Sequence, residues 1–299
     1  MKPVPHGEPY AGKLHVRFDE GAGVPDNKGR SALLYTLSPP SNHLIVSDSR
    51  RSTMKRRAIL LGHVDGLLST NLDLDKVHGY LTSLCGGAWN SGEIIRQVNI
   101  SRSALDELLQ DTRTGKFDYV FFYFSGHGEY KRGSILELNP QEETISERLL
   151  SNLAPRQLNI YDCCRTLPRT QSIRVTNSFS LVRLSESYDK TREYFRMMYD
   201  DRILQAYEQQ MSLYSCSIGE SSYDFGEGGV YTKYFIDSAK TLDETYVLAS
   251  AAHSNACRLT TSEVFQHGKR QHPDYFMAKL PSRYQLICGL SSKLWNKYE

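Results

Sequence analysis

The sequence predicts an α/β protein in which helices cover both faces of a mainly parallel β-sheet. Short apolar runs alternate with segments of helical spacing, and two of the runs, 117–128 (FDYVFFYFSGHG) and 157–165 (QLNIYDCCR), are almost continuously apolar. Strands buried on both faces of a parallel sheet read in this way. The alternation of strand and helix is typical of a parallel sheet with a helical layer on each side.

The first half of this pattern begins with a strand over 57–61 that Gly62 ends. A helix over 72–84 follows, because its apolar residues recur three and four positions apart. After a short strand over 94–98, Ser101 is placed to cap a second helix, and Gly115 ends it. The strand that carries His127 follows, and then a hairpin near 134–139, a helix near 146–153 and the strand that carries Cys164.

The second half begins with an insertion around 166–210 in which glycine is absent and charged and aromatic residues are common. A long helix over 188–209 is expected there, with one apolar side formed by Phe195, Met198, Tyr199 and Ile203. The remaining elements are a strand over 211–217, a loop over 218–229, a helix over 230–239, one or two further helices, and a last strand within 284–290.

Composition indicates a soluble globular protein. Of 299 residues, 39% are hydrophobic and 23% charged, and the formal net charge is only +2. Such a charge gives no argument for nucleic-acid binding, and no apolar run approaches the roughly 18 residues of a membrane span. The first residues lack the apolar core of a secretory signal, so we expect a cytoplasmic protein with free thiols.

The first 53 residues differ from the rest, since they hold six of the eleven prolines. We interpret 1–53 as a Pro/Gly-rich extension and 54–299 as one domain. The extension either docks a regulatory partner protein or is a tail without function.

His127 and Cys164 each follow an apolar strand. In parallel sheets, ligand chemistry gathers at the carboxyl ends of the strands, so the two strands are expected to deliver an imidazole and a thiol to one edge. A thiol beside a base is the arrangement for covalent hydrolysis through a cysteine nucleophile.

Three blocks of residues resemble the caspase-like peptidases, especially their bacterial and metacaspase branches. They are Ser125-Gly126-His127-Gly128, Asp162-Cys163-Cys164-Arg165, and the stretch 214–224 with its continuation at 229–232. The resemblance covers roughly 55–290 and implies a caspase-like fold and a cysteine endopeptidase acting on proteins. It also implies a His127–Cys164 dyad and an oxyanion held by the backbone N–H groups of Gly128 and Cys164.

Two departures from the animal caspase pattern bear on the substrate. His127 precedes Cys164 by 37 positions, where about 50 is usual, and Asp162 replaces a glutamine. In metacaspase-like relatives this acid lines the specificity pocket and a second acid, here Asp224, faces it. Two carboxylates in one pocket favour a cationic guest, so the resemblance implies cleavage after Arg or Lys.

Each pocket residue also has a structural interpretation. Asp162 could cap a turn, Asp224 could be an ordinary loop acid, and Cys216, which matches a pocket-lining position, could be a buried apolar residue. Since consecutive side chains of a strand alternate faces, Cys163 and Cys164 cannot both face His127. The resemblance selects Cys164.

Regulation is less determined by the sequence. Cleavage of a zymogen in the insertion would fit four candidate bonds, after Arg165, Arg169, Arg174 and Arg183. No metal or other cofactor is expected, because no twelve-residue calcium loop is present. Calcium activation remains an alternative, with oxygens from Asp73, Asp75, Glu220, Asp224 and Glu227.

The alternative function is a catalytically silent caspase-like scaffold. A nucleotide-binding sheet protein is disfavoured, because no phosphate-binding glycine loop follows the first strand.

Overall fold

A six-stranded sheet forms the centre of the computed structural model, which describes residues 54–67, 69–167, 190–243 and 245–297. The candidate partner-binding extension and the bonds after Arg169, Arg174 and Arg183 lie outside these ranges. The strands are, in spatial order, β10 (Asp274–Phe276), β8 (Gln209–Tyr214), β7 (Arg156–Cys163), β3 (Tyr119–Gly126), β1 (Arg56–Gly62) and β2 (Ile94–Val98). All neighbours pair in parallel except β10, which runs antiparallel to β8.

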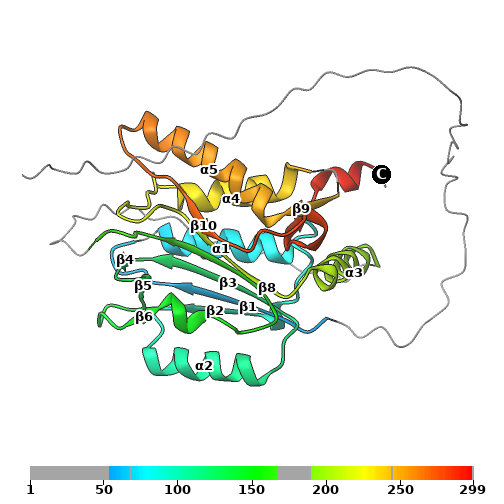
Figure 1. The fold of residues 1–299 in the computed structure, drawn as a ribbon, viewed down its shortest axis with the longest axis horizontal. Helices are drawn as coiled ribbons and strands as arrows, with labels where there is room; N and C mark the ends of the chain where they lie inside the picture. The colour runs from blue at the N-terminus through cyan, green and yellow to red at the C-terminus, as the bar shows by residue number, and fades with distance from the viewer. Residues whose placement is uncertain (1–53, 68, 168–189, 244, 298–299) are drawn as a thin grey trace, which may run out of the picture. The chain divides into compact units, whose positions relative to one another are not determined.

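Helices cover both faces of this sheet, which confirms the predicted α/β architecture (Figure 1). The helix α2 (Arg102–Thr114) lies on one face, and α1 (Ser69–Thr82), α4 (Val230–Thr241) and α5 (Ala249–Gln266) lie on the other. Side chains of β3 alternate between the two layers: Tyr123 packs with α1 and α4 residues, whereas Phe122 and Phe124 pack with α2 residues. Both layers are closed by apolar side chains, so the continuous apolar runs belong to central strands.

The helix α3 (Lys190–Gln205) joins the layer of α1 through Phe195, Tyr199 and Ile203, which are buried. It is shorter than the predicted helix over 188–209, because Gln209 already begins β8.

A buried arginine ties α3 to the start of the sheet. Arg56 donates from Nη1 to the Asp200 carboxylate at 2.6 Å and lies over the ring of Trp89 at 4.4 Å. Burial raises the pKa of Asp200 to about 6, against the opposing effect of Arg56.

Two small sheets complete the fold. One contains β4 (Gly128–Tyr130), β5 (Ser134–Glu137) and β6 (Thr144–Ser146), so the predicted hairpin near 134–139 is instead the middle strand of three. The other pairs β9 (Tyr246–Leu248) with β11 (Ile287–Leu290), so the last apolar run does not extend the main sheet.

Short 3₁₀ segments fill several connections. The helix expected near 146–153 is a single 3₁₀ turn, Glu147–Leu150, that Ser146 caps. The others are Ser91–Glu93, Ser282–Tyr284 and Ser292–Lys297. Within the described ranges, no helix combines the length and apolarity that crossing a membrane requires.

Candidate active site

The pairing of β3 with β7 places His127 and Cys164 side by side in the sheet. Gly126 is the register partner of Cys163, so the next residue of each chain segment emerges at the same carboxyl edge. Adjacent strands lie about 4.8 Å apart. The predicted catalytic residues therefore come from neighbouring backbones, although 37 positions separate them in sequence.

One ring nitrogen of His127 is already engaged. Its Nε2 lies 3.1 Å from the carbonyl oxygen of Asp65, in the turn that follows β1. A carbonyl oxygen can only accept a hydrogen bond, so Nε2 carries a proton, and in the neutral ring Nδ1 therefore carries the lone pair. Asp65 thus fixes both the tautomer of His127 and the nitrogen that can accept a proton.

The two adjacent cysteines have different environments. Cys163 is 1% exposed and packs with the apolar residues on the α2 face, whereas Cys164 is partly exposed. The Cys164 thiol points to the carbonyl oxygen of Ser222, with Sγ and O 3.9 Å apart. Desolvation by burial raises the pKa of this thiol, so it is protonated at neutral pH and needs a base to react.

Gly128 lies directly against the cysteine segment. A methyl group at this position would lie 2.9 Å from Cys163 Sγ and 2.9 Å from the carbonyl oxygen of Cys164. Glycine is therefore required here for close backbone approach, not for an unusual dihedral angle. The predicted oxyanion groups, Gly128 and Cys164, are neighbours in this arrangement.

Asp162 is a buried carboxylate immediately before the two cysteines. It is 5% exposed, and its two oxygens accept hydrogen bonds from the hydroxyls of Ser222 and Thr232, each at 2.6 Å. Thr232 lies in the first turn of α4, where the helix dipole favours a negative charge. Burial nevertheless dominates and raises the pKa of Asp162.

A second buried carboxylate of this region is Asp73, which the sequence did not suggest as a pocket acid. Asp73 is 2% exposed, and its oxygens accept from the Ser125 hydroxyl at 2.9 Å and from the Gly229 N–H at 2.8 Å. Burial, followed by repulsion from Asp162, raises its pKa well above the usual range. The pKa of Asp73 therefore responds to the charge of Asp162 inside the protein.

Asp224, the acid predicted to face Asp162, lies in the same loop. Its backbone forms a β-bridge with Gly229, and its carboxylate accepts from the Ser69 hydroxyl at 2.7 Å and from the Gly226 N–H at 3.0 Å. The helix α1 therefore contacts Asp224 through Ser69 and supplies Asp73 from its next turn. A role of Asp224 in substrate binding stays a prediction.

Cys216 is fully buried. Its sulfur lies 3.3 Å from the carbonyl oxygen of Cys163 and 3.4 Å from that of Glu220, so it packs beneath the cysteine segment. Burial raises the pKa of this thiol. Cys216 therefore contacts the backbone of the segment that carries Cys163 and Cys164.

Two glycines bring a loop against the acidic pair. A methyl group at Gly229 would collide with Asp162 Oδ2, and one at Gly228 would collide with Asp73 Oδ1. Gly228 also has a φ of 90°, which disfavours other residues. The backbone of this loop thus contacts both carboxylates.

The sequence did not predict the roles of Asp65, of Asp73 as a pocket acid, or of Gly228. Ser125, Ser222, Thr232 and Gly229 lie in the blocks that carry the resemblance, but their contacts with the two acids were not predicted. One signal was available for Asp73. Asp73 precedes Val77 and Leu81 at intervals of four residues, so it lies on the same face of the helix, and both of those residues are buried. An acid on the apolar face of a helix indicates a functional or paired group. Nothing comparable marks Asp65, which acts through its backbone.

The acids suggested for calcium do not converge. Apart from Asp73, each has a different partner: Arg96 for Asp75, His272 for Glu220, Ser69 for Asp224 and Lys233 for Glu227. Across the described part of the chain, no three His, Cys, Asp or Glu side chains are grouped so as to hold a metal ion.

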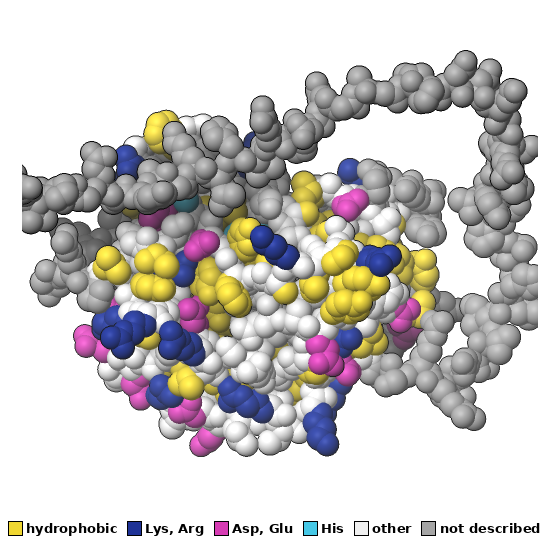
Figure 2. Space-filling model, in the orientation of Figure 1, with side chains coloured by type: hydrophobic (Ala, Val, Ile, Leu, Met, Phe, Trp, Pro, Cys, Tyr) yellow, Lys and Arg dark blue, Asp and Glu magenta, His cyan; other side chains and the backbone are white. Residues whose placement is uncertain are grey.

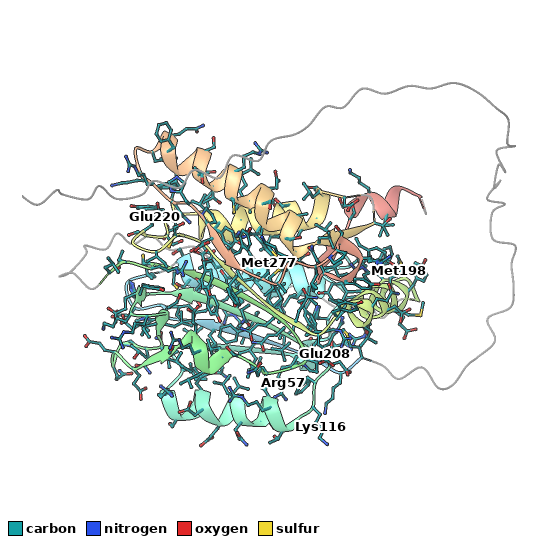
Figure 3. The ribbon with its side chains drawn as sticks, in the orientation of Figure 1. Arg57, Lys116, Met198, Glu208, Glu220 and Met277 are labelled. Atoms are coloured by element: carbon teal, nitrogen blue, oxygen red, sulfur yellow. The ribbon has the colours of Figure 1, made fainter. Side chains whose placement is uncertain are left out.

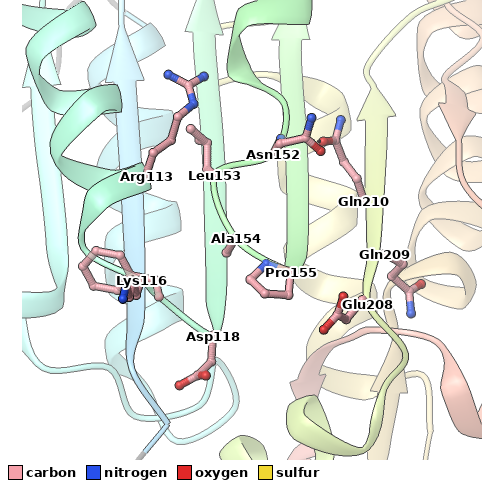
Figure 4. A pocket seen from close by; sticks show the side chains of 11 residues that line it. Arg113, Lys116, Asp118, Asn152, Leu153, Ala154, Pro155, Glu208, Gln209 and Gln210 are labelled. Carbon is pink, nitrogen blue, oxygen red and sulfur yellow. Dashed lines mark hydrogen bonds between the residues drawn. The ribbon is translucent and has the colours of Figure 1, made fainter.

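A cavity of about 710 Å³ lies away from this site (Figure 4). Residues such as Lys116, Pro155 and Gln209 line it, next to the amino ends of β3, β7 and β8. Figure 3 shows Lys116 and Glu208 at that end and Glu220 near the opposite end.

The face in Figure 2 mixes basic and acidic side chains, as expected from the small net charge.

The arginine that follows Cys164 is inaccessible. Arg165 is 4% exposed, its Nη1 donates to the carbonyl of Cys216 and the carboxylate of Asp274, and its guanidinium lies 3.9 Å from the ring centroid of Tyr214. Of the four bonds predicted for self-cleavage, the one after Arg165 is therefore shielded in the folded protein.

Comparison with known proteins agrees with the geometry. The family model of the caspase domain matches residues 55–285, so the chain belongs to the caspase-domain family, a family of cysteine peptidases. Among solved structures, caspase-1 from Spodoptera frugiperda is similar in fold, with a TM-score of 0.51, 13% identity, and coverage of 80% of this chain and 92% of that one. No curated protein sequence matches.

Proposed function

We propose that the protein is an endopeptidase in which Cys164 is the nucleophile and His127 the general base. The observation that carries this proposal is the contact of His127 Nε2 with the Asp65 carbonyl, which leaves Nδ1 of the neutral ring as a proton acceptor at the edge where Cys164 emerges. Because burial raises the thiol pKa, proton removal by His127 is needed for attack.

The reaction then has two stages. Cys164 Sγ attacks the peptide carbonyl while Nδ1 of His127 takes the thiol proton, and the imidazolium returns that proton to the leaving amine. Water then hydrolyses the thioester with His127 again as base. Backbone N–H groups of Gly128 and Cys164 are proposed to hold the oxyanion, and loss of one such donor typically costs about 3 kcal/mol in the barrier.

The proposed substrate residue before the scissile bond is Arg or Lys. Asp162 and Asp73 supply two carboxylates. Asp73 has acceptor capacity beyond its bonds to Ser125 and Gly229, whereas the hydroxyls of Ser222, Thr232 and Ser215 already bind Asp162 and would have to share it with the guest. A guanidinium can bind both carboxylates through paired, charge-assisted hydrogen bonds, and its charge offsets their repulsion. An aspartate side chain would instead add negative charge beside two acids whose pKa values are already raised.

Entry of such a side chain requires the covering loop to move. Asp73 and Asp162 are almost fully buried, and the Gly229 N–H binds Asp73 directly. We propose that substrate displaces the Gly228–Gly229 backbone and that the hydroxyls of Ser125, Ser222 and Thr232 keep the carboxylates oriented meanwhile.

Fluorogenic peptides ending in Arg, Lys or Asp test this function. We expect cleavage after Arg and Lys, abolished in Cys164→Ala and largely retained in Cys163→Ala. A preference for Asp would contradict the proposed pocket. If an arginyl chloromethylketone fails to label Cys164 under any condition, the chain acts instead as a catalytically silent scaffold.

For the biological role, family membership is the only support. We propose a regulated effector protease of a cell-death or defence pathway, kept as a zymogen until a partner binds the extension 1–53. Mass-spectrometric mapping of new protein termini in a proteome treated with wild-type and Cys164→Ala protein would identify substrates. The absence of new termini would argue against an effector protease.

A further inference from the structure

A second histidine, His63, lies against His127. The centroids of the two rings are 5.1 Å apart, and their planes meet at 77°, which is an edge-to-face arrangement. His63 is the first residue after β1, and its side chain is completely buried. Such a contact restricts the rotation of the His127 ring, because the edge of one ring fits the face of the other.

The backbone before His127 also packs on His63. The N–H of His63 donates to the Ser125 carbonyl at 3.0 Å. A methyl group at Gly126 would lie 2.9 Å from His63 Cβ, and Gly126 has a φ of 155°, which favours glycine. His63 therefore contacts the segment that carries the base at both its backbone and its side chain.

Glu137, at the end of β5, connects the two histidines. Its Oε1 lies 3.6 Å from His63 Nδ1, and its N–H donates to the His127 carbonyl at 3.1 Å. Glu137 from β5 and His127 thus both face His63. From α1, the Thr70 hydroxyl donates to the His63 carbonyl at 3.2 Å.

We propose that His63 is a positioning residue for His127 and that Glu137 supports it. His63 holds the His127 ring in the orientation that lets Nε2–H donate to the Asp65 carbonyl. In this orientation Nδ1 stays available to accept the thiol proton. The Glu137 carboxylate, through its contact with His63, stabilises the positive charge that His127 acquires after proton transfer. This inference rests on the proposed function of His127.

Kinetics with arginyl peptides provide the first test. We expect His63→Ala to lower kcat at least about tenfold with KM within about twofold, because ring orientation matters to proton transfer rather than to binding. His63→Phe keeps an edge-to-face partner and should recover most of the loss. An unchanged kcat in His63→Ala, or no recovery in His63→Phe, would overturn the positioning role.

The NMR signals of the His127 ring provide the second test, in a Cys164→Ala background that needs no activity. Glu137→Gln should change the ring nitrogen shifts of His127, because it removes the carboxylate that contacts the adjacent His63 ring. Glu142→Gln, which removes the same charge from an exposed position between β5 and β6, is the matched control and should change these shifts less. Ring shifts of His127 that respond equally to both changes would overturn the role of Glu137.

The two tests separate this inference from the proposed function. If the wild-type protein cleaves no peptide after Arg or Lys, the proposed function fails, while the ring NMR signals of His127 still report the influence of Glu137. Both Glu137 and Glu142 are near the surface, so these variants are expected to fold even if His63→Ala does not.

Discussion

Replacing Asp73 by Asn separates the pocket seen in the structure from the one that the sequence suggested. Asparagine keeps the shape of the side chain and removes one negative charge. Its carbonyl oxygen can still accept from the Gly229 N–H, and its amide can donate to the Ser125 hydroxyl, which rotates. The free energy of unfolding should therefore change by less than about 1 kcal/mol.

The effect on cleavage should be much larger. Two unit charges 4 Å apart attract by about 4 kcal/mol at an effective dielectric constant of 20, and desolvation of the guanidinium and of Asp73 offsets part of this. A net loss of about 2–3 kcal/mol is expected, as for hydrogen bonds to charged groups. This corresponds to a decrease of about 30- to 150-fold in kcat/KM for arginyl peptides.

Steady-state kinetics at pH 7 provide the assay. Asp75→Asn is the matched control, because Asp75 is on the same helix but pairs with Arg96 near the surface, and it should retain kcat/KM within about twofold. Asp224→Asn should lose less than Asp73→Asn. If Asp73→Asn remains within threefold of wild type while Asp224→Asn loses activity, the assignment of the acidic pair is wrong.

The raised pKa values of the pair give this pocket a pH dependence with a definite sign. Burial favours the protonated acids, whereas a bound guanidinium favours the ionised ones. Binding of an arginyl inhibitor should therefore release protons and tighten as the pH rises through those pKa values. Calorimetry in buffers of different ionisation enthalpy measures the release, and proton uptake on binding would contradict it.

Three further predictions concern the thiol, the sheet and calcium. In the His127→Ala variant, the rate of Cys164 alkylation should rise with pH to a midpoint above the roughly 8.5 of a free cysteine, because burial raises the thiol pKa. A midpoint below about 8 would be inconsistent with that environment. Arg56→Met should lower the free energy of unfolding by about 3 kcal/mol in denaturant titrations, since it removes the buried partner of Asp200 and leaves the longer pair with Arg196 at 3.8 Å. Arg57→Met breaks a pair with a largely exposed acid and should lower that free energy by about 1 kcal/mol or less. Equal losses in the two variants would mean that burial of the pair is unimportant. Activity should persist in excess chelator, because the candidate calcium oxygens have separate partners, and a reversible loss on chelation that calcium restores would refute this.

The sequence by itself determined the order of the elements and the position of the site along them. Continuous apolar runs identify β3 and β7 as central strands, because a strand covered on both faces has no polar side. Alternation along β7 predicts that Cys163 and Cys164 face different surroundings, and the structure buries the first and partly exposes the second. Such local patterns report which face of an element is buried.

Tertiary structure decided which side chains meet across elements. Asp73 lies 89 positions before Asp162 and reaches it only because α1 packs over the carboxyl half of the sheet, beside the loop that ends at Gly229. The contacts of Asp65 and His63 with His127 depend on the turn after β1 lying next to the end of β3. Periodicity within one segment carries no information about such distant contacts, because they depend on how separate elements pack together.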